Sequence, residues 1–164
     1  MPEENIPEWP ARYLPARAGR PPKTQRRLPH VQLDQWPPGA ITEKLIDWST
    51  HLPHIRPRES RMTSPQTRAL RLPDEFAHGP RDAFIDDHEF CLLHPAPSGG
   101  LHLTLPERIR EQVLRTRWGE QHPGAAAGIL PATLVMIYAP RDEEELAIVM
   151  RLVEISYRFA SGGR

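Results

Sequence analysis

The stretch AFIDDHEFCLLHPAPSGGLHLTL, residues 83–105, decides the fold. Two apolar segments, residues 83–95 and 101–105, stand on either side of prolines and glycines that are typical of a turn. The leucines of the second segment alternate, so they share one face of a strand, and His102 and Thr104 must point to the opposite face. The stretch therefore predicts a hairpin with one apolar and one polar face.

Whether His94 and His102 lie together depends on how the two strands of this hairpin pair. If His94 pairs with Leu101, His102 points to the other side of the sheet. If His94 pairs directly with His102, both imidazoles line one surface, because a shift of one residue moves a side chain to the opposite face. The sequence leaves both registers open.

The segment after the hairpin, TLPERIREQVLRTRW (104–118), predicts a helix. Thr104 is its expected N-cap and Glu107, three residues later, completes a capping box. Pro106 is tolerated in the first turn of a helix because its missing N–H would have no partner there. The arginines of this segment lie away from its apolar stripe and indicate a solvated face.

A further strand and helix follow. The run TLVMIY (133–138) is almost continuously apolar, which is typical of a strand covered on both sides. The last helix is expected to begin after Asp142, with Glu145 at its third position, and to end at Gly162-Gly163. Its apolar residues recur at helical spacing: Leu146, Val149, Met150, Val153 and Tyr157.

From residue 83 the order of elements is therefore strand, strand, helix, strand, helix, or β-β-α-β-α. This order predicts an α+β fold, a small, mostly antiparallel sheet with helices packed on one face. The segment GAITEKLIDWST (39–50) adds a short helix in front of it. We expect residues 39–164 to form a single domain.

Residues 1–38 differ from the rest of the chain, with nine prolines and almost no periodic apolar pattern. They predict an extended or disordered basic arm. Trp9, Tyr13 and Trp36 favour a second interpretation, because a fully solvated arm has little use for aromatic side chains. In that interpretation the arm docks on the domain itself or on an acidic protein partner.

The composition excludes several classes of function. Acidic and basic residues number 21 each, so no net charge draws the chain to nucleic acid or to anionic membranes. Cys91 is the single cysteine, which rules out an internal disulfide. Because no apolar run reaches the roughly 18–20 residues that span a bilayer, we expect a soluble cytoplasmic protein.

Histidines are the candidates for chemistry: His88, His94, His102 and His122. They show no compact HxH or HExxH spacing, so the local signal for a metal is weak. Each histidine alone is best explained as a hydrogen-bonded structural side chain. Together with Glu120 and Arg141, three of them nonetheless predict a polar pocket.

Four motifs in a fixed order carry a family resemblance: LHP before GLHLTL, then RWGEQHP, then YAPRDEEELAIVMRLVEISYRF. They resemble the luciferase-like domain of fungal luciferases and of many short bacterial proteins, over roughly residues 75–161. The positions that match the family's pattern are His94, His102, Trp118, Gly119, His122, Pro123, Tyr138, Arg141 and Glu144. Fungal members have more histidines before the LHL strand than this chain.

The resemblance implies a reaction class, that of a cofactor-independent oxygenase in which a deprotonated hydroxypyrone-like substrate meets O2. No cofactor is then expected, with O2 as co-substrate. The catalytic candidates are His94, His102, His122 and Arg141, with a histidine as base and Arg141 beside the enolate oxygen. The candidates for substrate binding are Trp118, Glu120 and Tyr138. Alternatively, Arg141 pairs with the acidic helix start and Trp118 belongs to the core.

Two other functions stay open at this stage. One is a non-catalytic module that binds a small molecule, or that recruits a protein through the proline-rich arm. The other is a metalloenzyme in which His94, His102 and His122 hold Zn or Fe. No nucleic acid or membrane is expected as a partner.

Overall fold

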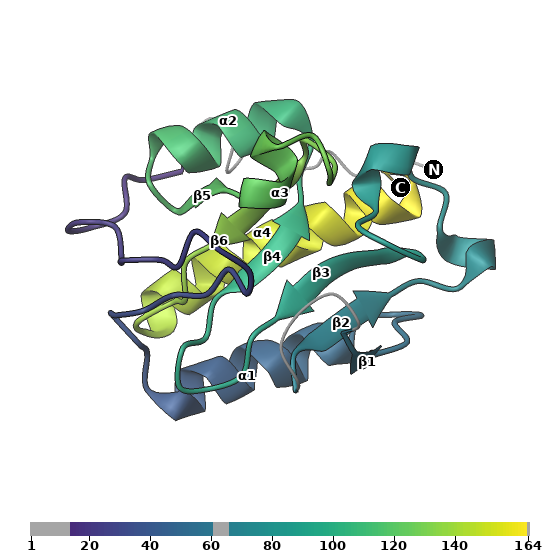
Figure 1. Ribbon diagram of the computed structural model, residues 1–164. Helices are drawn as coiled ribbons and strands as arrows, with labels where there is room; N and C mark the ends of the chain where they lie inside the picture. Colours follow the sequence, from purple (N-terminus) through teal and green to yellow (C-terminus); the bar gives the residue numbers. More distant parts are fainter. Residues whose placement is uncertain (1–13, 61–65, 164) are drawn as a thin grey trace.

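The computed structural model describes residues 14–60 and 66–163, which form one sheet with helices around it (Figure 1). Six antiparallel strands stand in the order β1-β2-β3-β4-β6-β5. Their bounds are β1 Arg58–Glu59, β2 Arg68–Arg71, β3 Glu89–Leu93, β4 Leu101–Thr104, β5 Gly119–Gln121 and β6 Leu134–Ile137. The predicted antiparallel sheet is confirmed. The segment RALRLP (68–73) also favours a strand and contains β2, whereas β1 and β5 are additions that the sequence pattern did not indicate.

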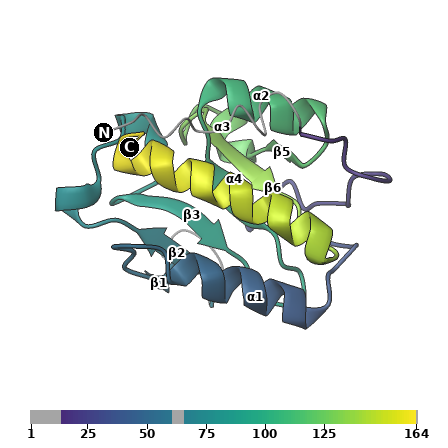
Figure 2. The same ribbon diagram turned by 180° about the vertical axis from the view of Figure 1, so that it is seen from behind.

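Four α-helices accompany the sheet in the described part of the chain. They are α1 Gly39–Thr50, α2 Glu107–Arg115, α3 Pro123–Ala126 and α4 Glu143–Ser161, with short 3-10 turns at Asp74–Phe76 and Arg81–Ala83. Helices α1 and α4 lie side by side over one face of the sheet (Figure 2). The predicted α+β fold is therefore confirmed, with the short α3 inserted between β5 and β6.

The apolar core fills the space between the sheet and helices α1 and α4. Leu101, Leu103 and Leu105 are fully buried in it, as the alternation of β4 predicts. Buried residues of α4 meet them from the helix side: Leu146, Val149, Leu152 and Val153. At about 25 cal/mol per Å² of apolar surface removed from water, this layer is the main source of stability.

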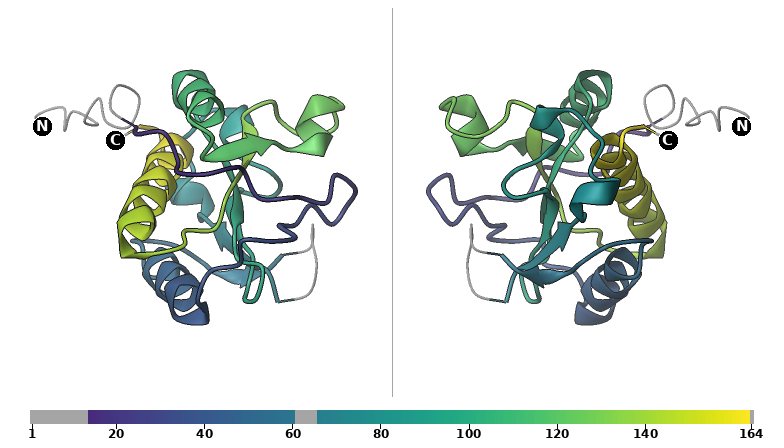
Figure 3. Two further views of the ribbon diagram at one scale, coloured as in Figure 1. Left: turned by 90° about the vertical axis from the view of Figure 1, so that its left-hand side faces the viewer. Right: turned by 90° about the vertical axis from the view of Figure 1, so that its right-hand side faces the viewer.

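The opposite face of the sheet is covered by the arm. Figure 3 shows α1 and α4 on one side of the sheet and the extended chain before α1 on the other. Arg17, His30 and Gln32 are buried there. Gln32 fixes the arm, because its side-chain carbonyl accepts the N–H of Ala139 at 3.0 Å.

Of the aromatic residues expected to dock the arm, Trp36 belongs to the described residues. Trp9 and Tyr13 lie outside the described residues. Trp36 is half exposed, and its indole N–H donates to the backbone carbonyl of Gln32 within the arm. Contact with the domain comes instead from other residues of the arm, among them Leu14 in the core and Gln32 at Ala139.

Of the two predicted helix N-caps, one is wrong and the other is confirmed. Thr104 does not cap α2, since it belongs to β4 and its hydroxyl donates to the carbonyl of Ala83 at 2.7 Å. Pairing with β6 keeps Thr104 in the sheet, and α2 starts after Pro106 without a side-chain cap. The carboxylate of Asp142 accepts the N–H of Glu145 at 2.8 Å, as expected.

Two glycines, Gly119 in β5 and Gly162 after α4, occupy positions that other residues would not fit. A Cβ at Gly119 in β5 would lie 2.1 Å from the carbonyl oxygen of Met136, so no side chain fits there. Gly162 ends α4 in the left-handed conformation, φ 106°. None of the helices in the described ranges is both long enough and apolar enough to cross a membrane.

Candidate functional site

The pairing of β3 with β4 brings His94 and His102 together on the face covered by the arm. Leu92 pairs with His102, and the N–H of His94 donates to the carbonyl of Gly100. Neither of the two registers considered from the sequence occurs, since His94 lies opposite Gly100. Leu92, His94 and His102 nevertheless share one face, because strand side chains alternate with a period of two.

A chain of hydrogen bonds joins these two histidines to the arm and to β5. Nε2 of His94 lies 3.3 Å from Nδ1 of His102, and Nε2 of His102 lies 3.2 Å from Nδ1 of His30. Nε2 of His30 lies 3.1 Å from Oε2 of Glu120. We call His94, His102, His30 and Glu120 the histidine chain. Its three imidazoles are almost completely excluded from solvent.

The bonds of the histidine chain fix the positions of its protons. A carboxylate only accepts, so Nε2 of His30 carries the proton and Nδ1 of a neutral His30 must accept from His102. Nε2 of His102 then carries a proton, and its Nδ1 accepts from Nε2 of His94. At the far end Nδ1 of His94 lies 3.4 Å from the hydroxyl of Thr67. One assignment thus satisfies every bond while the histidines are neutral.

His122 lies beside the histidine chain without a ring hydrogen bond to it in the described structure. Its ring meets those of His30 and His102 edge to face, with centroids 5.1 and 4.8 Å apart. Nδ1 of His122 caps α3 by accepting the N–H of Gly124 at 2.9 Å. A neutral His122 therefore carries its proton on Nε2.

Burial keeps the imidazoles of His94, His102 and His122 neutral. It lowers the pKa of His94 and of His122 to about 4, with neighbouring histidines adding to the effect. The pKa of His102 falls well below its ordinary value for the same two reasons. At neutral pH such groups hold one proton each and can donate and accept.

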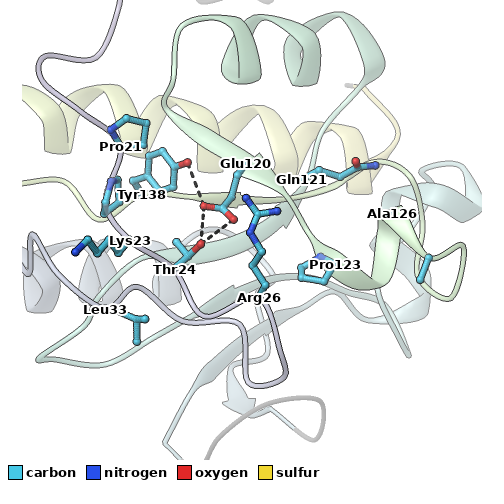
Figure 4. Close-up of a pocket in the computed structure, with 12 residues that line it drawn as sticks. Pro21, Lys23, Thr24, Arg26, Leu33, Glu120, Gln121, Pro123, Ala126 and Tyr138 are labelled. Carbon is cyan, nitrogen blue, oxygen red and sulfur yellow. Dashed lines mark hydrogen bonds between the residues drawn. The ribbon is translucent and has the colours of Figure 1, made fainter.

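Glu120 ends the histidine chain at the surface of an open groove (Figure 4). Its carboxylate also accepts the hydroxyls of Thr24, at 2.9 and 3.0 Å, and of Tyr138, at 3.1 Å. Burial opposes its ionisation, but the hydrogen bonds from His30, Thr24 and Tyr138 outweigh burial and leave the pKa below its usual value. Burial raises the pKa of Tyr138, and the negative charge of Glu120 raises it further.

The groove has a volume of about 990 Å³ and lies between the arm and the β5–α3 segment. Its lining combines charged, polar and apolar residues: Pro21, Pro22, Lys23, Thr24, Arg26, Leu33, Glu120, Gln121, Pro123, Ala126, Ala127 and Tyr138. A small cavity of about 50 Å³ touches the imidazoles of His30, His102 and His122. A small organic molecule therefore fits the groove but not this cavity.

The predicted site residues do not all meet. His94, His102, His122, Glu120 and Tyr138 gather around the histidine chain and the groove. Arg141 instead makes a two-bond ion pair with Glu145, at 2.9 and 2.7 Å, and also donates to the carbonyl of Ala18. This is the alternative arrangement, in which Arg141 pairs with the start of the last helix.

Trp118, His88 and Cys91 lie away from the histidine chain. Trp118 is a core residue whose indole N–H donates to the carbonyl of Pro15 at 2.6 Å. His88 pairs with Asp74 at 3.1 Å. Cys91 is fully buried, and burial raises the pKa of its thiol, as expected for a small core residue.

Sequence reasoning missed His30 and Thr24, the two arm residues that hydrogen-bond to Glu120. Both stand among prolines and arginines, in a segment without any period that marks a buried face. Their partners, His102 and Glu120, are 72 and 96 residues away along the chain. The one usable signal was the presence of aromatic residues in the arm, which indicated docking but no site residue.

Fold and site together define an α+β domain with a buried polar chain beneath an open groove, an arrangement suited to binding or converting a small molecule. Residues 87–156 match the luciferase domain family. The resemblance drawn from the sequence motifs is thus confirmed. No solved structure matches the chain significantly.

Curated relatives are fungal luciferases. The chain is 29% identical to a luciferase of Armillaria gallica over 160 residues, which covers 87% of this chain and 59% of the relative. It is 39% identical to a luciferase of Armillaria mellea over 70 residues, covering 42% of this chain and 26% of the relative. The chain spans about three fifths of the length of the first relative. Because 87% of the chain is more than residues 39–164 contain, this match extends into the arm.

Proposed function

We propose that the protein is an enzyme that removes a proton from a small enolisable molecule, of the hydroxypyrone type, and lets the resulting anion react with O2. The observation that carries this proposal is the carboxylate of Glu120, which faces the groove and is backed by His30 and His102. The fungal relatives named luciferase support an oxygen-dependent reaction. No bound cofactor is required in this proposal, and O2 is the co-substrate.

Glu120 is the proposed base. It lies in the groove, whereas His102 is buried and reaches the groove only through His30 and Glu120. A proton taken from the C–H or O–H of the substrate passes to Glu120, and His30 holds this carboxylate in place by donating its Nε2–H across 3.1 Å. His94 and His102 act as positioning residues, since they hold His30 in one orientation.

The oxygen step then balances without another reactant. The enolate carbon supplies the electrons for a C–O bond to O2, and the peroxide anion that forms takes back the proton held by Glu120. One substrate and one O2 give one hydroperoxide. The roles first assigned to His122 and Arg141 stay predictions. Arg141 is already paired with Glu145, whereas His122 presents Nε2–H as a donor.

O2 consumption by the purified chain, measured with an electrode against a panel of small enolisable molecules that begins with hydroxypyrones, tests the proposal. We expect Glu120→Gln to lower kcat by about 100-fold or more, because a positioned base contributes about 10²–10⁴ in rate. His102→Asn should lower kcat with little change in KM. His51→Asn, at an exposed histidine, is the matched control and should have no effect.

Unchanged kcat in folded Glu120→Gln overturns the role of Glu120. Binding of panel molecules without O2 consumption by any of them favours the non-catalytic binding module instead.

A metalloenzyme is a second candidate, favoured by one observation. His30, His102 and His122 each offer a ring nitrogen, and these three atoms lie within 4.8 Å of one another. Glu120 stands behind His30, as carboxylates often stand behind metal-binding histidines. The ligand set thus differs from the one expected from the sequence, with His30 in place of His94.

The geometry of two histidines favours hydrogen bonding over metal binding. The rings of His30 and His102 are nearly parallel, at 14° with centroids 5.2 Å apart, and Nε2 of His102 lies 3.2 Å from Nδ1 of His30, the distance of an N–H···N hydrogen bond. The N–H of Gly124 also occupies Nδ1 of His122. A zinc ion, with N ligands at about 2.0–2.1 Å, would require these rings to turn.

Elemental analysis of the untagged protein decides between the two candidates. Near-stoichiometric Zn, Fe, Mn or Cu that is lost in His30→Ala and His122→Ala, but kept in His51→Ala, would promote the metalloenzyme. Absence of metal from a folded and active protein would support the reaction through Glu120.

A further inference from the structure

The residues that line the groove beside Glu120 carry more positive than negative charge. Lys23 and Arg26 are the cations that line it, and Glu120 is the acid, so these residues sum to one positive charge. The chain as a whole has a formal net charge of zero. The groove is therefore positive relative to the rest of the molecule, and field lines concentrate in concave surfaces of this kind.

Neither cation makes an ion pair that holds the described part of the chain together. Within residues 14–60 and 66–163 no ion pair joins Lys23 or Arg26 to a carboxylate, whereas the neighbouring Arg20 is paired with Asp34 at 2.8 Å. The side chains of Lys23 and Arg26 come from the same arm segment that carries Thr24, which donates to Glu120. Figure 4 shows the guanidinium of Arg26 on the groove side of the arm, between Glu120 and Pro123.

The remaining walls of the groove are mostly apolar and rigid. Proline rings line it from both sides, at Pro21, Pro22 and Pro123, and Leu33 leaves about half of its surface exposed there. Flat apolar bodies pack well on such walls without ordering flexible side chains. The carboxylate of Glu120 is engaged by three donors, and it therefore opposes an anion less than a free carboxylate would.

We propose that the groove binds a small molecule with a flat apolar body and an anionic group, a carboxylate or sulfonate, that lies against Arg26 and Lys23. The body lies on the proline walls, and its far end reaches Glu120 and Tyr138. This deepens the proposed function by naming the charge of the substrate. It is tested by binding alone, so it stands or falls separately from turnover.

Two fluorescent probes with similar aromatic bodies test the inference. 8-Anilinonaphthalene-1-sulfonate is anionic, and N-phenyl-1-naphthylamine is its neutral counterpart. Each is titrated into the full chain and into a Lys23→Gln/Arg26→Gln variant. The Arg27→Gln/Arg81→Gln variant removes the same charge from exposed residues outside the groove lining. Circular dichroism confirms that each variant is folded.

We expect the groove variant to bind the anionic probe about tenfold more weakly, with the neutral probe changed by less than about twofold. The control variant should bind both probes as the unchanged chain does. Raising the salt concentration to about 1 M should weaken the anionic probe alone, because salt screens exposed charges.

Three results would overturn the inference: equal affinities for the two probes, an equal loss in both variants, or no binding of either probe by folded protein. If O2 consumption persists while the anionic probe fails to bind, the ligand charge is wrong and the proposed function stands. Charge-dependent binding without any turnover supports the inference and counts against the proposed function.

Discussion

The two faces of the sheet use the same strands for different purposes. On the helix-covered face, β4 buries Leu101 and Leu103 against α4. On the arm-covered face, the same strand presents His102 to His94 and His30. One face consists of apolar contacts that need only shape, while the other consists of hydrogen bonds that need particular atoms. Stability and the candidate chemistry are thus separated by the thickness of one sheet.

The largest effect on stability is expected on the helix-covered face. Leu103 is fully buried, so Leu103→Ala should lower the free energy of unfolding by about 4 kcal/mol through lost burial and the cavity left behind. Urea denaturation followed by circular dichroism measures it. Activity per folded molecule should not change. A large loss of activity in the folded fraction would show that the two faces are coupled.

Acid should destabilise the arm-covered face. His94 has a pKa of about 4 in the folded chain against about 6.5 when exposed, so between these values the unfolded chain binds a proton that the folded chain does not. Stability is therefore full above about pH 6.5 and falls as the pH drops towards 4, by an amount on the order of 3 kcal/mol for His94. Denaturation at a series of pH values measures this slope.

His94→Gln is the variant that sharpens the acid test, since it removes the titrating group. Its stability should depend less on pH between 6.5 and 5 than that of the unchanged chain. His51→Asn, at an exposed histidine, should keep the original slope. Identical slopes in all three proteins would contradict the buried, neutral state of His94.

A smaller effect is expected where the arm meets the domain. Gln32→Ala removes the acceptor of the Ala139 N–H and leaves that buried donor unpaired, which should cost about 2 kcal/mol of unfolding free energy. Binding of ligands in the groove should weaken as well, because the same arm lines it. Gln25→Ala, in the exposed part of the arm, is the control. Equal stability of the two variants would show that Gln32 does not anchor the arm.

Local patterns predicted one face better than the other. The alternation of leucines in β4 and the period of α4 specified the helix-covered face, because each depends only on neighbours along the chain. The cap at Asp142 was predictable for the same reason. The apparent cap at Thr104 failed, since tertiary pairing with β6 holds that residue in the sheet.

The arm-covered face could not be predicted in the same way. Pairing of His94 with Gly100 depends on the geometry of the PAPSGG turn, which allows more than one register. His30 reaches His102 across 72 residues of chain, and its proline-rich surroundings carry no period that marks burial. The family resemblance identified His94, His102 and His122, but it assigned nothing to the arm.

Nuclear magnetic resonance of the imidazole nitrogens tests the central claim most directly. Long-range ¹H–¹⁵N spectra of labelled protein report which ring nitrogen of each histidine carries a proton. At pH 7 we expect His94, His102 and His122 to be neutral with the proton on Nε2, and Nε2 of His30 to carry the proton that it donates to Glu120. A proton on Nδ1 of His102 with Nε2 bare, or a charged His94, would contradict this arrangement.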